Sequence, residues 1–152
     1  MKKILIVSGA LVLLLSAVLI WRALHPPLTD EQQIAANLDA IAAAASARDA
    51  VTLASYLAPT FTFNDQGQTQ RKEFQRQLYG AILQYRVVDL GINGVQVKVQ
   101  GERASSDGRF ILSLKSEFSS PPEVHNGDFQ LQWQKSNGEW KIVAVKGKVP
   151  DL

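Results

Sequence analysis

Asp65 is the residue in this sequence that is best placed to act as a general base. It follows Phe61 and Phe63 at the same period-two spacing, so its carboxylate would lie beside apolar side chains. Such surroundings raise the pKa of a carboxyl group toward the range that suits proton abstraction. Aspartate is also favoured at the start of a turn such as Asp65–Gly67, because its side chain bonds nearby backbone amides. We interpret Asp65 first as a turn residue and keep the general base as the alternative.

The sequence lacks the other common patterns of catalytic and metal-binding residues. Its two histidines, His25 and His125, stand far apart, without the short spacing that metal ligands on one element show. The absence of cysteine excludes disulfides, cysteine nucleophiles and thiolate metal sites. Neither a glycine-rich phosphate loop nor a G-x-S-x-G motif occurs in the chain. We therefore expect no metal site and no cofactor.

Two helices are predicted ahead of Asp65. Thr29 followed by Gln32 forms a capping box, which predicts a helix that runs to about Arg48. Asp49 can cap a second, short helix, which Pro59 would end. The first of these helices carries an apolar stripe at helical spacing: Ile34, Leu38, Ile41 and Ala45.

A strand and a third helix frame Asp65 itself. Phe61 and Phe63 alternate with threonine and asparagine, which favours a strand before the turn. A helix is predicted over residues 70–85 after it. Its apolar side contains Phe74, Leu78, Ile82 and Tyr85.

From Arg86 onward the apolar residues recur with a period of two, which predicts half-buried strands. Turn signals lie at Asn93-Gly94, at residues 106–108 and at residues 136–138, so we expect antiparallel hairpins at these three places. Helices that precede a run of strands predict an α+β domain, with three helices packed on one face of a curved, mainly antiparallel sheet.

The first 27 residues predict a membrane anchor. Lys2 and Lys3 precede 18 uncharged residues, Ile4 to Trp21, which as a helix would be about 27 Å long and could just span a bilayer. Large residues stand where a signal-peptide cleavage site needs small ones, and Trp21 with Arg22 is typical of the membrane interface. We predict an uncleaved anchor over residues 4–24 of a bacterial inner membrane, with an exported domain over residues 28–152. Cleavage, which would release a secreted binding protein, is the alternative.

The charge of the exported part does not favour nucleic acid as a partner. Of the 16 basic residues three lie in the anchor, which leaves 13 against 14 acidic residues. The cluster of Arg71, Lys72 and Arg76 is interrupted by Glu73 and is typical of a solvated helix face.

The order of these elements resembles that of the nuclear transport factor 2-like superfamily, also called the SnoaL-like or cystatin-like cone fold. The resemblance covers about residues 28–149 and includes the closing hairpin FQLQWQKSNGEWKIVAVKG. The family includes ketosteroid isomerases, dehydratases, polyketide cyclases and secretion-system scaffolds. The resemblance therefore implies the fold and leaves the function open.

A pocket between the helices and the concave face of the sheet is implied by the resemblance. We interpret Tyr56 first as a packing residue at the end of a short amphipathic helix, and the resemblance implies the alternative of an oxyanion donor, as a tyrosine is in isomerases of this fold. Lys146 shares the inward parity but lies near a strand end, where we expect solvent. The apolar parity gives the expected pocket lining, in which no side chain can transfer a proton: Phe61, Phe63, Val97, Phe110, Leu112, Leu131 and Trp133.

The last strand is apolar on both parities, which predicts that both of its faces are covered. Because the resemblance implies sheet-to-sheet dimers, a homodimer through this sheet could supply the second cover. Trp140, Val143 and Val145 would then lie at the interface.

Two functions follow as hypotheses. The first is a membrane-anchored, exported, non-enzymatic binding or scaffold module for an envelope protein or a small apolar ligand. The alternative is a SnoaL-like isomerase, cyclase or dehydratase that acts on a hydrophobic substrate. In that case Asp65 and Tyr56 must point into one cavity.

Overall fold

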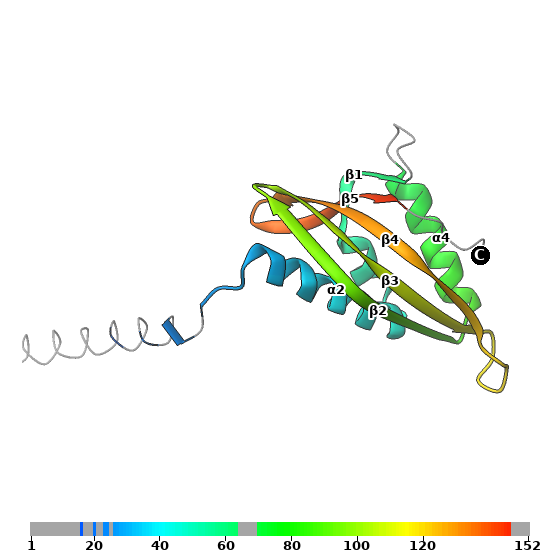
Figure 1. The fold of residues 1–152 in the computed structure, drawn as a ribbon. Helices are drawn as coiled ribbons and strands as arrows, with labels where there is room; N and C mark the ends of the chain where they lie inside the picture. Colours follow the sequence, from blue (N-terminus) through cyan, green and yellow to red (C-terminus); the bar gives the residue numbers. More distant parts are fainter. Residues whose placement is uncertain (1–15, 17–19, 21–22, 25, 64–69, 147–152) are drawn as a thin grey trace, which may run out of the picture.

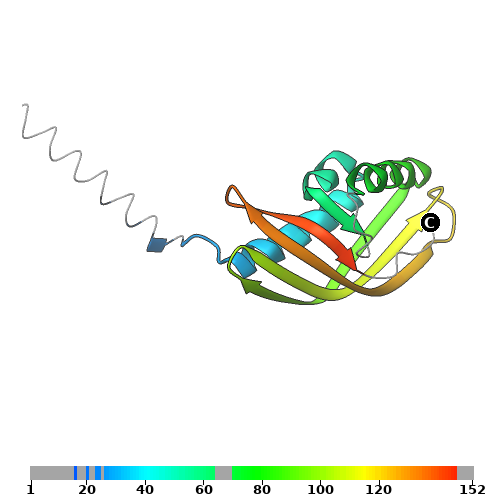
Figure 2. The same cartoon turned by 90° about the horizontal axis from the view of Figure 1, so that it is seen from above.

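The computed structural model describes residues 16, 20, 23–24, 26–63 and 70–146. In this part of the chain three helices lie on one side of a five-stranded sheet, which curves around them (Figures 1 and 2). The predicted α+β class is confirmed. The elements are α2 (Asp30–Ser46), α3 (Ala50–Ser55), β1 (Leu57–Phe63), α4 (Arg71–Gln84), β2 (Val87–Gln100), β3 (Arg103–Lys115), β4 (Glu123–Ser136) and β5 (Glu139–Lys146).

Most of the predicted anchor, residues 4–24, lies outside the described residues. Among those that are described, no helix is long and apolar enough to cross a bilayer. The residues of both buried core clusters fall between Ile34 and Val145. The described core residues therefore all lie within residues 28–152.

Both predicted helix starts are confirmed by their caps. The backbone amide of Gln32 donates to Thr29 Oγ1 at 3.3 Å, and the amide of Thr29 donates to Gln32 Oε1 at 3.0 Å. Asp49 caps α3, because its Oδ1 accepts from the amide of Thr52 at 3.0 Å. These bonds occupy amides that no helical carbonyl can reach. The two bonds between Thr29 and Gln32 fix the residue at which α2 begins.

The sheet has the strand order β1-β5-β4-β3-β2. Strands β2 to β5 pair antiparallel with their neighbours, whereas β1 pairs parallel with β5. The last strand therefore lies between the first strand and the rest of the meander. Helix α2 packs along β2 on the concave face, and α4 packs on β1 (Figure 1).

Two of the three predicted turns are wrong. Asn93 pairs with Arg109 while Gln96 pairs with Asp107, so β2 holds one extra residue and forms a β-bulge. Gly94 has φ +64°, a value that suits a bulge as well as a turn. Residues 106–108 lie inside β3. Only the third prediction is confirmed, since Asn137 and Gly138 both have positive φ, as a two-residue type I′ turn requires.

A second bulge explains why β5 is apolar on both parities. Trp133 pairs with Ile142 and Gln132 pairs with Ala144, so Val143 is the extra residue. In a regular strand Ile142 and Val145 would face opposite sides of the sheet. Because of the extra residue between them, both side chains face inward. The predicted second cover of this strand stays a prediction.

Trp140 does not fit the predicted role at an interface. It is only 2% exposed within one chain and belongs to the hydrophobic core. Its indole N–H donates to Asp30 at 3.1 Å, and Lys135 donates to the same carboxylate oxygen at 2.7 Å. The bond from Lys135, and then that from Trp140, hold the pKa of Asp30 below its usual value. This network ties the first turn of α2 to the β4–β5 hairpin.

One end of the concave face is filled and the other is hollow. At the filled end Trp133 packs with Ile34 and Leu38 of α2, and its indole N–H donates to the hydroxyl of Ser106 at 2.8 Å. Both partners of this bond are buried. The hollow end lies toward α4.

Candidate ligand-binding cavity

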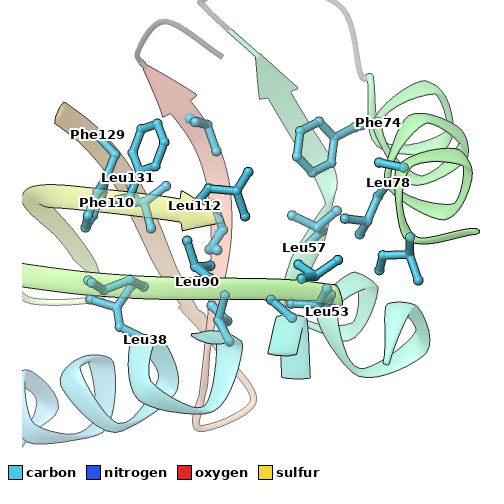
Figure 3. Close-up of a pocket in the computed structure, with 18 of the residues that line it drawn as sticks. Leu38, Leu53, Leu57, Phe74, Leu78, Leu90, Phe110, Leu112, Phe129 and Leu131 are labelled. Carbon is cyan, nitrogen blue, oxygen red and sulfur yellow. The ribbon is translucent and has the colours of Figure 1, made fainter. Parts of the chain in front are cut away.

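A cavity of about 330 Å³ lies between the concave face of the sheet and the three helices. Figure 3 shows Phe110, Leu112, Phe129 and Leu131 from the strands on one side, and Leu53, Leu57, Phe74 and Leu78 on the other. The apolar residues that line it are Leu38, Ile41, Ala45, Leu53, Leu57, Phe74, Leu78, Ala81, Ile82, Val88, Leu90, Ile92, Phe110, Leu112, Leu114, Phe129, Leu131, Ile142 and Val145.

The periodicity of each element places these side chains in the wall. Alternate residues face inward along the first half of β2 and the second half of β3: Val88, Leu90, Ile92, Phe110, Leu112 and Leu114. Helix α4 contributes residues of one face at helical spacing, Phe74, Leu78 and Ile82. The described helices and strands thus meet at the cavity through their apolar faces.

The charged lining residues that the structure describes are Asp128 and Lys146. The side chain of Asp128 is 82% exposed and forms an ion pair with Arg109 at 3.2 Å. Lys146 is the last residue of β5 and is half-buried. These two residues form the charged rim of the cavity, and the other lining residues in the described part of the chain are apolar.

Phe74 connects the cavity wall to the core behind it. Its ring lies 5.0 Å from that of Phe61 and 6.4 Å from that of Phe63, measured between centroids. These two residues of β1 pack against Phe74 and do not line the cavity. The prediction that they face the pocket is therefore corrected, since the aromatic side chain of α4 lines the cavity where the two β1 residues were expected.

The other predicted lining residues divide between the cavity and the core. Phe110, Leu112 and Leu131 line the cavity. Val97 and Trp133 do not, because they lie nearer the β2–β3 turn, where the tryptophans and the first half of α2 fill the space. The alternation of apolar residues predicted which side chains lie on the inner face of the sheet. It did not predict which of them pack in the core and which line the cavity.

The prediction omitted the wall that the helices supply. Leu38 and Ile41 of α2 and Phe74 and Leu78 of α4 line the cavity, and all four lie on the apolar sides that helical spacing identified. Phe129, on the inward parity of β4, also lines it. The signal was present in the sequence, but only the packing of helices on the sheet turns it into a pocket wall.

The described structure does not test whether the two predicted catalytic residues share a cavity. Asp65 lies outside the described residues. Tyr56 is half-buried and lines a second pocket of about 380 Å³, between α2, the end of α3 and the β4–β5 turn. In that pocket Lys141 is already engaged, since its Nζ lies 3.0 Å from the carbonyl of Ser55 and 3.0 Å from Glu139.

The interface candidates on β5 are also placed by the structure. Val145 lines the apolar cavity, and Val143, at the bulge, is half-buried. The convex face of the neighbouring strand is polar, with exposed Gln130, Gln132 and Gln134. Among the described residues no three histidine, aspartate or glutamate side chains gather where they could hold a metal ion.

No protein-family model matches the sequence, and no curated protein sequence matches it significantly. Solved structures are similar to it. A candidate scytalone dehydratase from Novosphingobium aromaticivorans has a TM-score of 0.68 at 14% identity, over 78% of this chain and 82% of that one. A candidate dehydratase of the NTF2-like family from Streptomyces avermitilis has a TM-score of 0.67 at 16% identity, over 78% and 94%. A protein of unknown function with a cystatin-like fold from Nostoc punctiforme has a TM-score of 0.63 at 11% identity, over 82% and 95%.

At these identities the similarity shows the fold alone. The described domain has the NTF2-like, cystatin-like fold that the order of its elements predicted. The fold hosts unrelated functions, so function must be argued from the cavity.

Proposed function

We propose that this domain is a non-enzymatic binding module that holds a small apolar ligand between the sheet and the helices. The observation that carries the proposal is the composition of the cavity wall, in which 19 of the 21 lining residues that the structure describes are apolar. Burial of an apolar molecule against such a wall releases water from both surfaces. The charged rim can stay solvated while the ligand is buried.

The size of the cavity suggests the size of the ligand. An apolar cavity of about 150 Å³ is enough to bind benzene, and this one is about 330 Å³. A ligand of roughly two to three rings fits this ratio. Burial of about 300 Å² of apolar surface gains roughly 7.5 kcal/mol, part of which the entropy of association removes. We therefore expect a Kd of about 10 µM to 1 mM.

The first test is a titration of residues 28–152 with N-phenyl-1-naphthylamine, a neutral dye that fluoresces in apolar surroundings, followed by displacement with naphthalene. Leu112→Trp places a larger side chain in the cavity wall, and it is expected to weaken dye binding at least about tenfold. Ile111→Trp is the matched control, because Ile111 is the preceding residue on β3 and is 48% exposed. Equal affinities of the two variants would refute the cavity as the binding site.

A dehydratase, isomerase or cyclase for a hydrophobic substrate is the second candidate function. Two of the similar structures are named as candidate dehydratases, which favours it. Such an enzyme needs a proton acceptor at the cavity, and the described carboxylate there is Asp128. Incubation with naphthols or related probes separates the two functions, because a binding module returns these molecules unchanged, whereas an enzyme converts a substrate among them.

We also propose that residues 4–24 anchor the domain in a bacterial inner membrane, with the domain on the periplasmic side. The support is the basic start, the 18 uncharged residues and the interfacial Trp21 and Arg22. Helix α2 begins at Asp30, so the cavity would be held close to the membrane surface. An envelope protein partner and a homodimer through the sheet remain predictions.

Fractionation tests the anchor. The full-length chain with a C-terminal tag is expected to stay in carbonate-washed membranes at its full mass, while residues 28–152 alone are recovered in the soluble fraction. A soluble species of the full chain that has lost its first twenty-odd residues would instead support cleavage and a freely diffusing binding protein.

A further inference from the structure

Two glycines lie directly opposite two phenylalanines in the wall of the cavity. Gly108 of β3 pairs with Phe129 of β4, and Phe110 of β3 pairs with Gly127 of β4. Directly opposite residues of antiparallel strands share a face of the sheet. Because both phenylalanines line the cavity, both glycines lie on its concave face.

Because glycine has no side chain, the ring of the opposite phenylalanine occupies the space beside each glycine. A Cβ atom on Gly127 would lie 3.1 and 3.3 Å from two ring atoms of Phe110. A Cβ atom on Gly108 would lie 3.0 and 3.1 Å from ring atoms of Phe129. Carbon atoms in good contact are about 3.5–4.0 Å apart. A side chain at either position would therefore push a ring away from the sheet.

The backbone gives no other reason for glycine at Gly127. The described glycines with positive φ are Gly94, Gly101 and Gly138, and neither Gly108 nor Gly127 is among them. Gly108 has a second role, because its Cβ would also lie 3.0 Å from the carbonyl oxygen of Asn93, beside the bulge of β2. At Gly127 the contacts within 4 Å are with the Phe110 ring.

We infer that Gly108 and Gly127 set the depth of the cavity, by letting the rings of Phe129 and Phe110 lie against the backbone of the sheet. The two rings form part of the wall opposite Phe74 and Leu78 (Figure 3). Any shift of a ring away from the sheet is a shift into the space between these walls. The two glycine–phenylalanine pairs thus determine the size of the largest apolar ligand that fits the cavity. This consequence rests on the proposed function.

The test uses Gly127→Ala in residues 28–152. Its crystal structure is expected to show the Phe110 ring displaced toward α4, and its affinity for N-phenyl-1-naphthylamine is expected to fall about three- to tenfold. Gly91→Ala is the matched control, since its Cβ would lie 3.8 Å from the nearest atom, in ordinary contact. The double variant Gly127→Ala with Phe110→Leu removes the displaced ring, so it should regain the affinity of Phe110→Leu alone.

The outcomes separate this inference from the proposed function. A Phe110 ring that stays in place in Gly127→Ala overturns the inference whether or not the dye binds. A displaced ring in a protein that binds no dye supports the inference and refutes the proposed function. If the wild type binds the dye and both alanine variants bind it equally well, the role of Gly127 in ligand size is overturned. Should Gly127→Ala not fold, the double variant must fold, because the clash is then absent.

Discussion

Replacement of Trp133 by alanine is expected to lower the free energy of unfolding by about 3–5 kcal/mol, as for other large aromatic residues removed from a core. Trp133 is 1% exposed and packs against α2 at the filled end of the concave face. Its loss leaves a void there and also leaves the hydroxyl of Ser106 without the indole N–H at 2.8 Å. Urea unfolding of residues 28–152 measures the change, provided that the slope with urea stays constant.

Two further variants separate packing from the hydrogen bond. Ser106→Ala keeps the ring but leaves its buried N–H without the Ser106 acceptor, which should cost about 1–3 kcal/mol. When Ser106→Ala is combined with Trp133→Phe, both partners of the bond are gone, so the double variant should lose less than the sum of the single losses. Gln132→Ala, at the exposed neighbouring position, is the control and should stay within about 0.5 kcal/mol of the wild type. A loss below about 1 kcal/mol for Trp133→Ala would contradict the described core.

Leu38→Ala is expected to destabilise the domain and to enlarge its cavity together. Leu38 is 2% exposed, belongs to the core and also lines the cavity, so its truncation should cost about 2–5 kcal/mol. A larger apolar molecule should then bind the variant better than the wild type. Because a ligand that binds only the folded state stabilises it by RT ln(1 + [L]/Kd), the dye should raise the Tm of Leu38→Ala more than that of the wild type.

The control for this prediction is Asp39→Ala, at the next and exposed position of α2. It should change the free energy of unfolding by at most about 0.5 kcal/mol and leave the response to the dye unaltered. If Leu38→Ala is destabilised but responds to the dye as the wild type does, the void is not part of the binding site. Ligand binding would then have to be sought at the second pocket, which Tyr56 lines.

The sequence by itself determined the features that depend on near neighbours. Thr29 and Gln32 start α2 through two hydrogen bonds that close within four residues, so no other part of the chain is needed to specify them. The Asn137–Gly138 turn is similarly local, because it joins β4 to β5 with two residues of positive φ. Strand alternation also assigned Phe110, Leu112 and Leu131 to the inner face, since the side-chain period of a strand is independent of its partners.

Only the tertiary structure decided the features that depend on a partner strand or on the spacing of layers. Gly94 suits a turn and a bulge equally, and the pairing of β2 with β3 selects the bulge. Trp133 and Leu131 share one parity, yet the first lies in the core and the second lines the cavity, because α2 and the tryptophans fill only one end of the concave face. A cavity is the space that packed elements leave between them, and no local pattern in the sequence encodes where that space remains.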